Sequence, residues 1–444
     1  MFSRILDRLG GISMLHRLPV AVGLLCMTLL TVVLPLTAAV DQTPISITYW
    51  GWSYTIDCLK DNMDEFSKAN PNIQVTFTTL DPYNIYRRLG QAVSSSVQIP
   101  DVVVIEDSHL PEIAFTGGLL DLTDRAAPLR ARFNSFKWTN STYNGRVYSI
   151  PWDSGPVALF YRRDVFAKAD LPSAPDAVAK LLETWDSYYQ TAKTIKEKTG
   201  AYMFILPGSS NDGRLFEMLL QQQGLGYFDR NGKVALDNPR AVKTLDFLGR
   251  CYKDGLTSDN TAWTDPWEKA IADGTVATII GAAWMNNMLK TWIAENTSGL
   301  WGVVPLPVWA KDAGVRTSND GGTSLAITKR SKKIPAAWTF VQFMLARKES
   351  QLKMMKKYDS FPALEETYAD PFFVEPDPFY AEQPVRIIFA ELAKQIPAWY
   401  YTTDYAKANS ICSAEIQAFL MGAKDAKTAL ANAARTIRLK TKRP

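Results

Sequence analysis

The stretch YNGRVYSIPWDSGPVALFYRRDVF, from Tyr143 to Phe166, decides how this chain is organised. It holds two short runs of strand-like composition, and the run PWDSGP at residues 151–156 joins them. An Asn-Gly pair opens the first run and is a turn that β-hairpins prefer. Two prolines restrict the backbone of the connection, so that Trp152 and Asp153 are presented from a stiff segment. We therefore predict a rigid crossing here, with an aromatic ring and a carboxylate facing a small ligand.

Length and composition predict two folded lobes and argue against a nucleic-acid partner. The chain has 444 residues, more than one ordinary hydrophobic core accommodates. Of these residues 47% are hydrophobic and 21% are charged, as in folded proteins. The net charge is only +4, and the one basic run, residues 435–444, is a chain end. A nearly neutral body offers no electrostatic surface for DNA or RNA.

The N-terminus predicts export. Three arginines precede the apolar run Leu18–Leu36, and the small residues Thr37-Ala38-Ala39 follow it. This order is that of a signal peptide with its cleavage site, which we place at residues 1–39. The run also approaches the length of a membrane span, so a retained anchor is the alternative. We expect the mature protein in the periplasm or on the outer face of the cytoplasmic membrane.

Cysteine and histidine usage gives no basis for a metal, a cofactor or a catalytic triad. The mature chain keeps Cys58, Cys251 and Cys412, none at metal-ligand spacing from another, and they are not a disulfide framework. We expect buried free thiols, and one long-range disulfide is the alternative. His109 is the only histidine beyond the leader, which argues against a Ser-His-Asp triad or a multi-histidine zinc site.

The apolar pattern predicts alternating strands and helices. Ile45–Tyr49 and Ile73–Leu80 have strand composition around a helix at Asp57–Lys68, which is a βαβ order. Val102–Ile105 is continuously apolar, as in a strand buried on both faces, and acidic residues follow its carboxyl end. Ligands of open parallel sheets bind outside such ends. Further along we predict helices at 176–198, 214–223, 239–254 and 335–347, and strands at 275–280, 301–307 and 325–328.

Eight segments in a fixed order carry a resemblance to a known family. They are ITYWGW, FSKANPNIQVTF, PDVVVIEDSHLPEIAFTGGLLDLT, the opening stretch, DGTVATIIGAAW, WGVVPLPV, NDGGTSLAIT and AFLMGAKDAKTALANAARTI. Across residues 45–435 the chain resembles the extracellular solute-binding proteins of ABC importers, most closely the carbohydrate-binding group that includes maltose-binding proteins. The resemblance implies an α/β, two-lobed periplasmic-binding-protein-like fold, each lobe a mainly parallel sheet flanked by helices, joined by a hinge. We place one lobe at 43–151 and 317–350 and the other at 152–316 and 351–444.

The resemblance also implies a function without chemistry. A monomeric protein would close on a sugar or oligosaccharide and deliver it to the permease subunits of an ABC transporter. One alternative keeps the fold and changes the solute to a glycerol-phosphate diester or a polyamine. A remote alternative is a secreted carbohydrate-active enzyme with Asp107 and Asp153 as acid and base.

Tryptophans and carboxylates near the expected cleft are the candidate ligand contacts, because sugar faces pack on aromatic rings while sugar hydroxyls donate to carboxylates. Core packing, helix capping or a purely hinge role is the competing interpretation for each. In the last third of the chain Tyr400 and Tyr401 are neighbouring alternatives, and Trp399 is favoured. The candidates are Trp284, Asp153, Trp152, Asp107, Glu106, Trp50, Trp52, Asp320, Gly321, Gly322, Trp399 and Tyr358.

Two positions depart from the family pattern. Gly155 stands where maltose-binding proteins carry a sugar-contacting glutamate, and Asp153 is the candidate to take over that role. Ser108 and His109 stand where they carry an aspartate-arginine pair, and a one-residue shift would bring Asp107 to the aspartate. The resemblance therefore does not imply maltose itself.

Overall fold

The computed structural model describes residues 44–82, 84–95, 98–311 and 314–444. The signal peptide predicted for residues 1–39 lies outside the described residues. Within the described part of the chain, no helix has both the length and the apolar character needed to cross a membrane.

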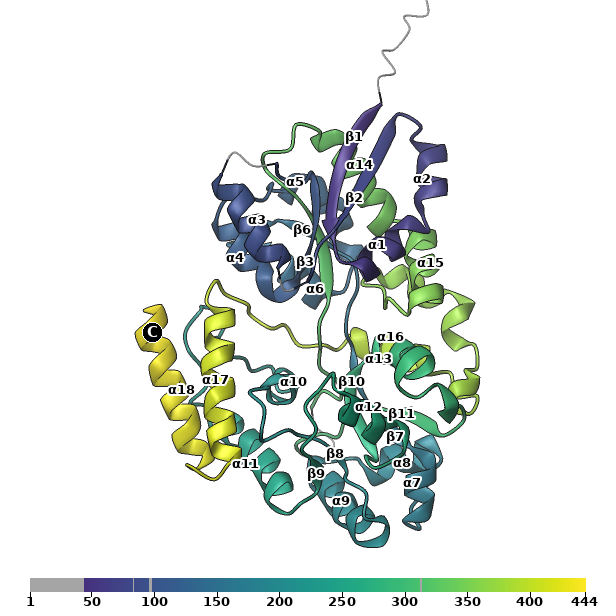
Figure 1. The fold of residues 1–444 in the computed structure, drawn as a ribbon, viewed down its shortest axis with the longest axis vertical. Coiled ribbons are helices and arrows are strands. Elements are labelled where there is room, and N and C mark those ends of the chain that lie inside the picture. Colours follow the sequence, from purple (N-terminus) through teal and green to yellow (C-terminus); the bar gives the residue numbers. More distant parts are fainter. Residues whose placement is uncertain (1–43, 83, 96–97, 312–313) are drawn as a thin grey trace, which may run out of the picture. The chain divides into compact units, whose positions relative to one another are not determined.

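The first lobe is built on a five-stranded sheet in the order β2-β1-β3-β12-β6. Strands β1 (Ile45–Gly51), β2 (Ile73–Thr79) and β3 (Val102–Glu106) are parallel, whereas β12 (Thr323–Ile327) runs antiparallel between β3 and β6 (Ser149–Pro151). Helix α14, shown in green beside β1 and β2 in Figure 1, buries its apolar side against this sheet. The remaining elements of this lobe are α1 Ser53–Lys60, α2 Met63–Ala69, α3 Ile85–Ser94, η1 Asp107–His109, α4 Leu110–Phe115, α5 Thr123–Ala126, η2 Ala127–Arg132, α6 Ser135–Asn140, β4 Thr142–Tyr143, β5 Arg146–Val147, α14 Ile334–Leu345 and α15 Lys348–Tyr358.

The second lobe has a central sheet in the order β10-β7-β11, and both pairings are antiparallel. The prediction of a mainly parallel sheet is therefore wrong for this sheet. Its central strand, β7 (Val157–Arg162), is buried at every position because helices and loops cover both faces. The continuous apolar sequence of such a strand does not indicate whether its neighbours run parallel or antiparallel to it. Parallel pairing occurs in the second lobe outside this sheet: Tyr202 bridges Val276, Thr184 bridges Val308, and β8 (Phe204–Ile205) pairs with β9 (Thr257–Ser258).

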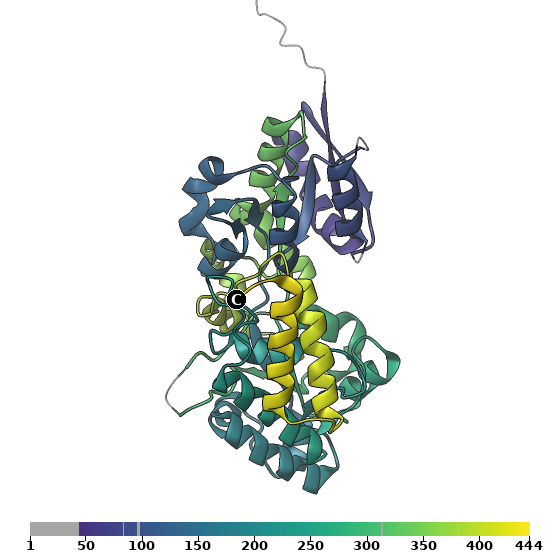
Figure 2. The same ribbon diagram turned by 90° about the vertical axis from the view of Figure 1, so that its left-hand side faces the viewer.

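Helices form most of the rest of the second lobe. The C-terminal pair α17 and α18 lies side by side, drawn in yellow in Figure 2. Its elements are β7 Val157–Arg162, α7 Arg163–Lys168, α8 Pro175–Leu181, α9 Trp185–Thr199, β8 Phe204–Ile205, α10 Arg214–Gln221, α11 Pro239–Lys253, β9 Thr257–Ser258, α12 Asp265–Ala272, β10 Thr278–Ala282, α13 Met285–Met288, η3 Leu289–Ile293, η4 Glu295–Thr297, β11 Trp301–Val304, η5 Glu365–Ala369, η6 Pro371–Val374, η7 Pro378–Tyr380, α16 Val385–Ala393, α17 Tyr405–Leu420 and α18 Ala426–Thr441.

Two predicted helices are each divided in the structure. The helix predicted at 57–68 is interrupted at Asn62, which is buried and donates from its side-chain amide to the Cys58 carbonyl. The helix predicted at 176–198 stops at Leu181 and restarts after Thr184, whose backbone is extended. The hydroxyl of Thr184 accepts a hydrogen bond from the Ser187 amide, and the hydroxyl of Ser187 accepts one from the Thr184 amide, which together form a capping box. Local capping therefore overrides a continuous apolar period.

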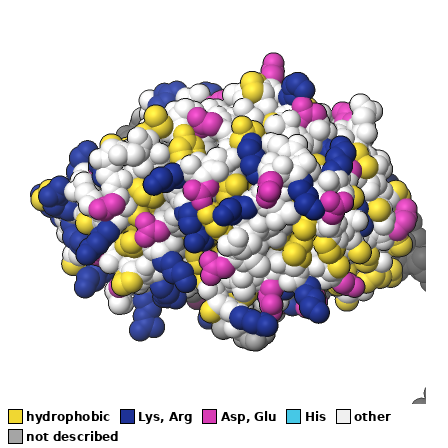
Figure 3. Space-filling model, turned by 90° about the horizontal axis from the view of Figure 1, so that it is seen from below, with side chains coloured by type: hydrophobic (Ala, Val, Ile, Leu, Met, Phe, Trp, Pro, Cys, Tyr) yellow, Lys and Arg dark blue, Asp and Glu magenta, His cyan; other side chains and the backbone are white. Residues whose placement is uncertain are grey.

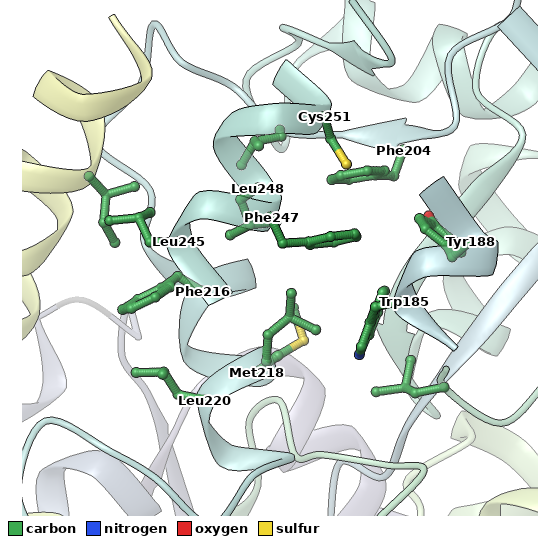
Figure 4. Packing of buried hydrophobic residues seen from close by; sticks show 14 of the residues in the cluster. Trp185, Tyr188, Phe204, Phe216, Met218, Leu220, Leu245, Phe247, Leu248 and Cys251 are labelled. Carbon is green, nitrogen blue, oxygen red and sulfur yellow. The ribbon is translucent and has the colours of Figure 1, made fainter. Parts of the chain in front are cut away.

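Aromatic side chains dominate the interior of the second lobe. Trp185, Tyr188 and Phe247 converge from α9 and α11, and Trp185 meets the rings of Tyr188 and Phe247 edge-on at 5.3 and 5.4 Å (Figure 4). Cys251 closes one side of this cluster. It is a buried free thiol, as are Cys58 and Cys412, so no disulfide joins the described cysteines.

Basic and acidic side chains are interspersed on the face of the molecule seen in Figure 3. No group of three or more His, Cys, Asp or Glu side chains among the described residues is arranged to hold a metal ion.

Three chain crossings connect the lobes and are hydrogen-bonded to one another. Asp153 in the first crossing bridges Pro362 in the third, and Pro156 bridges Asn319 in the second. The amide of Asp320 donates to the Gly155 carbonyl at 3.0 Å. Past the predicted boundary at residue 350 the chain packs on both sides: Met354, Ala363 and Leu364 join the cluster of the first lobe, whereas Leu352, Met355 and Phe361 join a cluster of the second.

Candidate functional site

A cavity of about 100 Å³ lies in the second lobe where β10 ends and the second crossing passes. Its walls come from β8, the loop before α10, the segment before α12, the turn after β10, and the hinge. Three tryptophans and three charged side chains are among the residues that line it. These six residues are Trp263, Trp267, Trp284, Asp212, Arg214 and Asp320.

Trp284 is held in place by the hinge. It caps α13 directly after β10 and is half-buried, with its ring at the cavity. Its indole N–H donates to the backbone carbonyl of Asp320 at 3.0 Å. The ring predicted to meet the ligand is thus fixed to the segment that connects the lobes.

Arg214 and Asp320 give the cavity one cation and one hinge carboxylate. Asp320 is the main cause that raises the pKa of Arg214, which keeps the guanidinium charged. Burial raises the pKa of Asp320, and Arg214 opposes that shift. Asp212 adds a second carboxylate and accepts from the Arg214 amide at 2.9 Å, at the start of α10. The polar side of the cavity therefore holds one cation and two carboxyl groups, which present hydrogen-bonding atoms without a net positive charge.

The first lobe has its own concave surface, a groove of about 760 Å³ at the carboxyl ends of β1 and β3. Trp52 and Glu106 both line it, together with Tyr86 and His109. The Tyr86 hydroxyl donates to the Glu106 carboxylate at 3.3 Å, and its ring stacks on His109 at 3.8 Å. Burial raises the pKa of Glu106 and lowers that of His109 to about 4. The groove thus presents a neutral imidazole, a phenol and a carboxyl group beside an indole.

Three predicted contacts are buried inside the protein. Trp152 is 1% exposed and Trp399 is 4% exposed, and each belongs to a lobe core. Asp107 is 2% exposed, and its oxygens accept from Lys137 at 2.5 Å and from Asn140 at 2.8 Å. None of the three lines the cavity with Trp284 or the first-lobe groove, so their contact with a ligand stays a prediction.

The remaining candidates serve the hinge or the lobe surface. One carboxylate oxygen of Asp153 accepts from both the amide and the hydroxyl of Thr323, each at 2.6 Å, which ties the first crossing to the second. Gly321 and Gly322 have φ values of 84° and 105°, which glycine adopts without strain. Trp50 lies under the Arg88 guanidinium at 5.7 Å, and the Tyr358 hydroxyl donates to the Asp57 carbonyl.

Sequence reasoning missed Arg214 and Trp263, and near position 399 the favoured Trp399 is buried in the core while Tyr401 is less so. Tyr401 is half-buried, and the carboxylates of Asp107, Glu217 and Asp320 add to burial in raising its pKa. The only sequence signal for Trp263 was an aromatic residue just before a helix start at Asp265-Pro266. No sequence feature near Arg214 indicates that it will lie near Asp320, which is more than 100 residues away in the chain.

Two α/β lobes joined by three crossings, with an aromatic cavity at the hinge, define a ligand-binding protein that grips a solute. The comparison with known families agrees: residues 53–351 match the model described as bacterial extracellular solute-binding protein. The chain belongs to that family.

Curated relatives and solved structures extend the match over most of the chain. A lactose-binding protein of Rhizobium radiobacter is 24% identical over 384 residues, 85% of this chain and 88% of the relative. An arabinooligosaccharide-binding protein of Bacillus subtilis (strain 168) is 25% identical over 420 residues, 88% of this chain and 92% of the relative. An ABC-transporter-associated binding protein from B. animalis subsp. lactis Bl-04, solved with β-1,6-galactobiose, superposes with a TM-score of 0.73 at 24% identity. That superposition covers 90% of this chain and 98% of the other, and it shows a shared fold.

Proposed function

We propose that this protein captures an uncharged sugar or oligosaccharide and hands it to the permease of an ABC transporter. The observation that carries the proposal is the convergence of Trp284, Trp263 and the charge pair Arg214–Asp320 on one cavity beside the hinge. Indole rings pack on the apolar faces of a pyranose, and the flanking charged groups satisfy its hydroxyls.

The comparisons support a sugar over the other solutes considered. The relatives described above are named for lactose and for arabinooligosaccharides. A phosphodiester would need unpaired cations, whereas Arg214 is already balanced by Asp320 and Asp212. A polyamine would need several carboxylates that remain free of a cation, and here Arg214 stands among them.

The same proposal covers location and partners. A protein of this family acts outside the cytoplasm, and we place this one in the periplasm or on the outer face of the cytoplasmic membrane, as a monomer that docks on permease subunits. The polar groups of the cavity bind and orient the sugar, and no step of bond cleavage is assigned to them.

Isothermal titration calorimetry tests this function directly. Lactose, arabinotriose, glycerophosphocholine and spermidine are titrated into the wild-type protein and into Trp284→Ala. We expect at least one of the two sugars to bind, and the substitution to weaken that binding at least tenfold, about 1.4 kcal/mol. Binding of spermidine or the phosphodiester in place of both sugars would contradict the proposal.

A further inference from the structure

Trp263 holds a backbone conformation that a large side chain rarely adopts. Its φ is +67°, in the left-handed region, and the residue is not a glycine. For a bulky residue this value is a genuine outlier. Such conformations persist where the surroundings impose them, and they concentrate at sites where a protein binds something.

The strain is imposed by a tight turn on both sides of the residue. The hydroxyl of Thr264 donates to the Thr261 carbonyl at 2.7 Å, and the amide of Trp267 donates to the Thr264 carbonyl at 2.9 Å. These bonds fix the chain before and after Trp263 as it enters α12. The turn therefore fixes the orientation of the Trp263 side chain, and the strained backbone lowers the stability of the folded state.

That side chain gains little from the protein core. It is 42% exposed, although it is an indole. Its ring lies 5.1 Å from Trp267 and 6.1 Å from Trp284, and it forms part of the cavity wall. The Arg214 guanidinium sits 5.7 Å from the same ring. A strained residue that remains exposed beside a cavity is not explained by packing.

Trp263 and Trp284 have different positions in the wall. Trp284 is anchored to the hinge through its bond to the Asp320 carbonyl, whereas Trp263 makes no hinge contact that the structure shows and is the more exposed of the two. The two rings are inclined by 32° with their centroids 6.1 Å apart, and both line the cavity, so its aromatic wall contains more than one indole. Trp284 forms the part of this wall next to the hinge, and Trp263 forms the part farther from it.

We propose that Trp263 is a specificity-determining residue, and that its strained turn exists to extend the aromatic wall under a second ring of the bound sugar. This inference rests on the proposed sugar-binding function and adds the residue that sets the preference for an oligosaccharide. The sugar unit on Trp284 binds next to the hinge, and the next unit lies on Trp263. A ligand of one ring would leave Trp263 uncovered.

Three variants test the assignment. Trp263→Gly removes the ring and relieves the positive φ, Trp263→Asn removes the ring with a residue that also tolerates this φ, and Trp292→Ala removes another exposed tryptophan (51% exposed) that does not line the cavity. Thermal unfolding without ligand and calorimetry with galactose, lactose, arabinose and arabinotriose are measured for each.

For Trp263→Gly we expect an unfolding temperature that is unchanged or higher, because strain is removed and little packing is lost. Affinity for the disaccharide or trisaccharide that the wild type binds should fall at least tenfold, with a smaller change for the matching monosaccharide. Trp263→Asn should show the same loss, and Trp292→Ala should leave affinity within twofold of the wild type.

The outcomes separate the two proposals. Wild-type protein that binds none of the four sugars contradicts the proposed function. Wild-type protein that binds an oligosaccharide, with both Trp263 variants retaining affinity within twofold, overturns the role of Trp263 alone. Equal losses for the monosaccharide and the oligosaccharide overturn the assignment of a second sugar unit to this ring. A Trp263→Gly variant that unfolds at a lower temperature and keeps its affinity shows that the turn serves stability.

Discussion

Lys137 and Asp107 form a buried ion pair beneath the second crossing, with side-chain exposures of 0% and 2%. The ammonium group also donates to the Thr323 carbonyl at 3.1 Å, and a side chain at Gly322 would collide with it. Breaking such a pair from one side strands a charge away from water, whereas replacing both partners by apolar groups is often neutral. The ion pair therefore fixes the position of the carboxyl end of β3 relative to the second crossing.

Lys137→Met should lower the free energy of unfolding by about 3–5 kcal/mol, because the Asp107 carboxylate stays buried without its cation. The double variant Lys137→Met with Asp107→Leu should recover most of that loss. Urea unfolding of the wild type, single variant and double variant measures the difference. A single variant as stable as the wild type would show that the pair contributes nothing. Sugar affinity of the double variant should remain within tenfold, since neither side chain lines either cavity.

At this scale the sequence predicted the positions of Trp284, Asp320 and Glu106 at cavity walls, because each follows a recognisable strand or hinge segment. It could not separate Asp107 from Glu106. The two carboxylates are adjacent in the chain, and only the fold places Lys137 beneath one of them. Trp263 was missed because a positive φ at a non-glycine residue leaves no mark in the sequence.

At the scale of elements, the hinge ribbon owes its close approach to Gly155. A β-carbon at this position would overlap the carbonyl of Asp320, whose amide donates to the Gly155 carbonyl. This explains why the glutamate expected there from related proteins is absent: the second crossing occupies its space. The carboxylate at the cavity comes instead from Asp320, on the crossing that displaced it.

Gly155→Ala should therefore force the first two crossings apart and destabilise the protein by about 1–3 kcal/mol. It should also weaken sugar binding, because Trp284 is hydrogen-bonded to the carbonyl that must move. Gly90→Ala is the matched control for stability alone, since a β-carbon added at Gly90 in α3 would meet no atom within 4 Å and the variant should not lose stability. Thermal unfolding compares both variants with the wild type, and calorimetry measures sugar binding by Gly155→Ala. A Gly155→Ala protein indistinguishable from wild type would contradict this account of the hinge.

The elements themselves were predictable where local pattern and packing agree. The strands around 45–49, 73–80 and 102–105 and the helix around 335–347 appear close to where apolar periodicity puts them. The orientation of β10 and β11 against β7 was not predictable, because strand direction depends on which segments pair and a strand buried on both faces reads alike in either direction. The break at Thr184 depends on a side-chain capping box, and at Asn62 a buried side-chain amide donates back to the Cys58 carbonyl. An apolar period registers neither interaction.

At the scale of the whole molecule, each lobe has a concave surface of its own: the cavity with Trp284 in the second lobe and the groove with Trp52 and Glu106 in the first. We propose that the sugar contacts both surfaces, in which case it favours the state in which both are engaged, by its differential affinity for that state. The whole chain should then respond to binding, although the cavity with Trp284 is lined almost entirely by the second lobe and the hinge.

Hydrogen exchange with a saturating sugar tests this. Amides of β10 and of the hinge at 319–322 should exchange more slowly, and so should those of η1 and α4 behind the first-lobe groove. At a free sugar concentration 100 times Kd, mass action stabilises the folded state by about 2.7 kcal/mol, so amides that exchange only through global unfolding should slow about 100-fold. Amides that exchange through local opening away from both concave surfaces should not change, which makes them the internal control. Slowing confined to the second lobe would show that the sugar is held by the Trp284 wall alone, and that the first-lobe groove takes no part in gripping it.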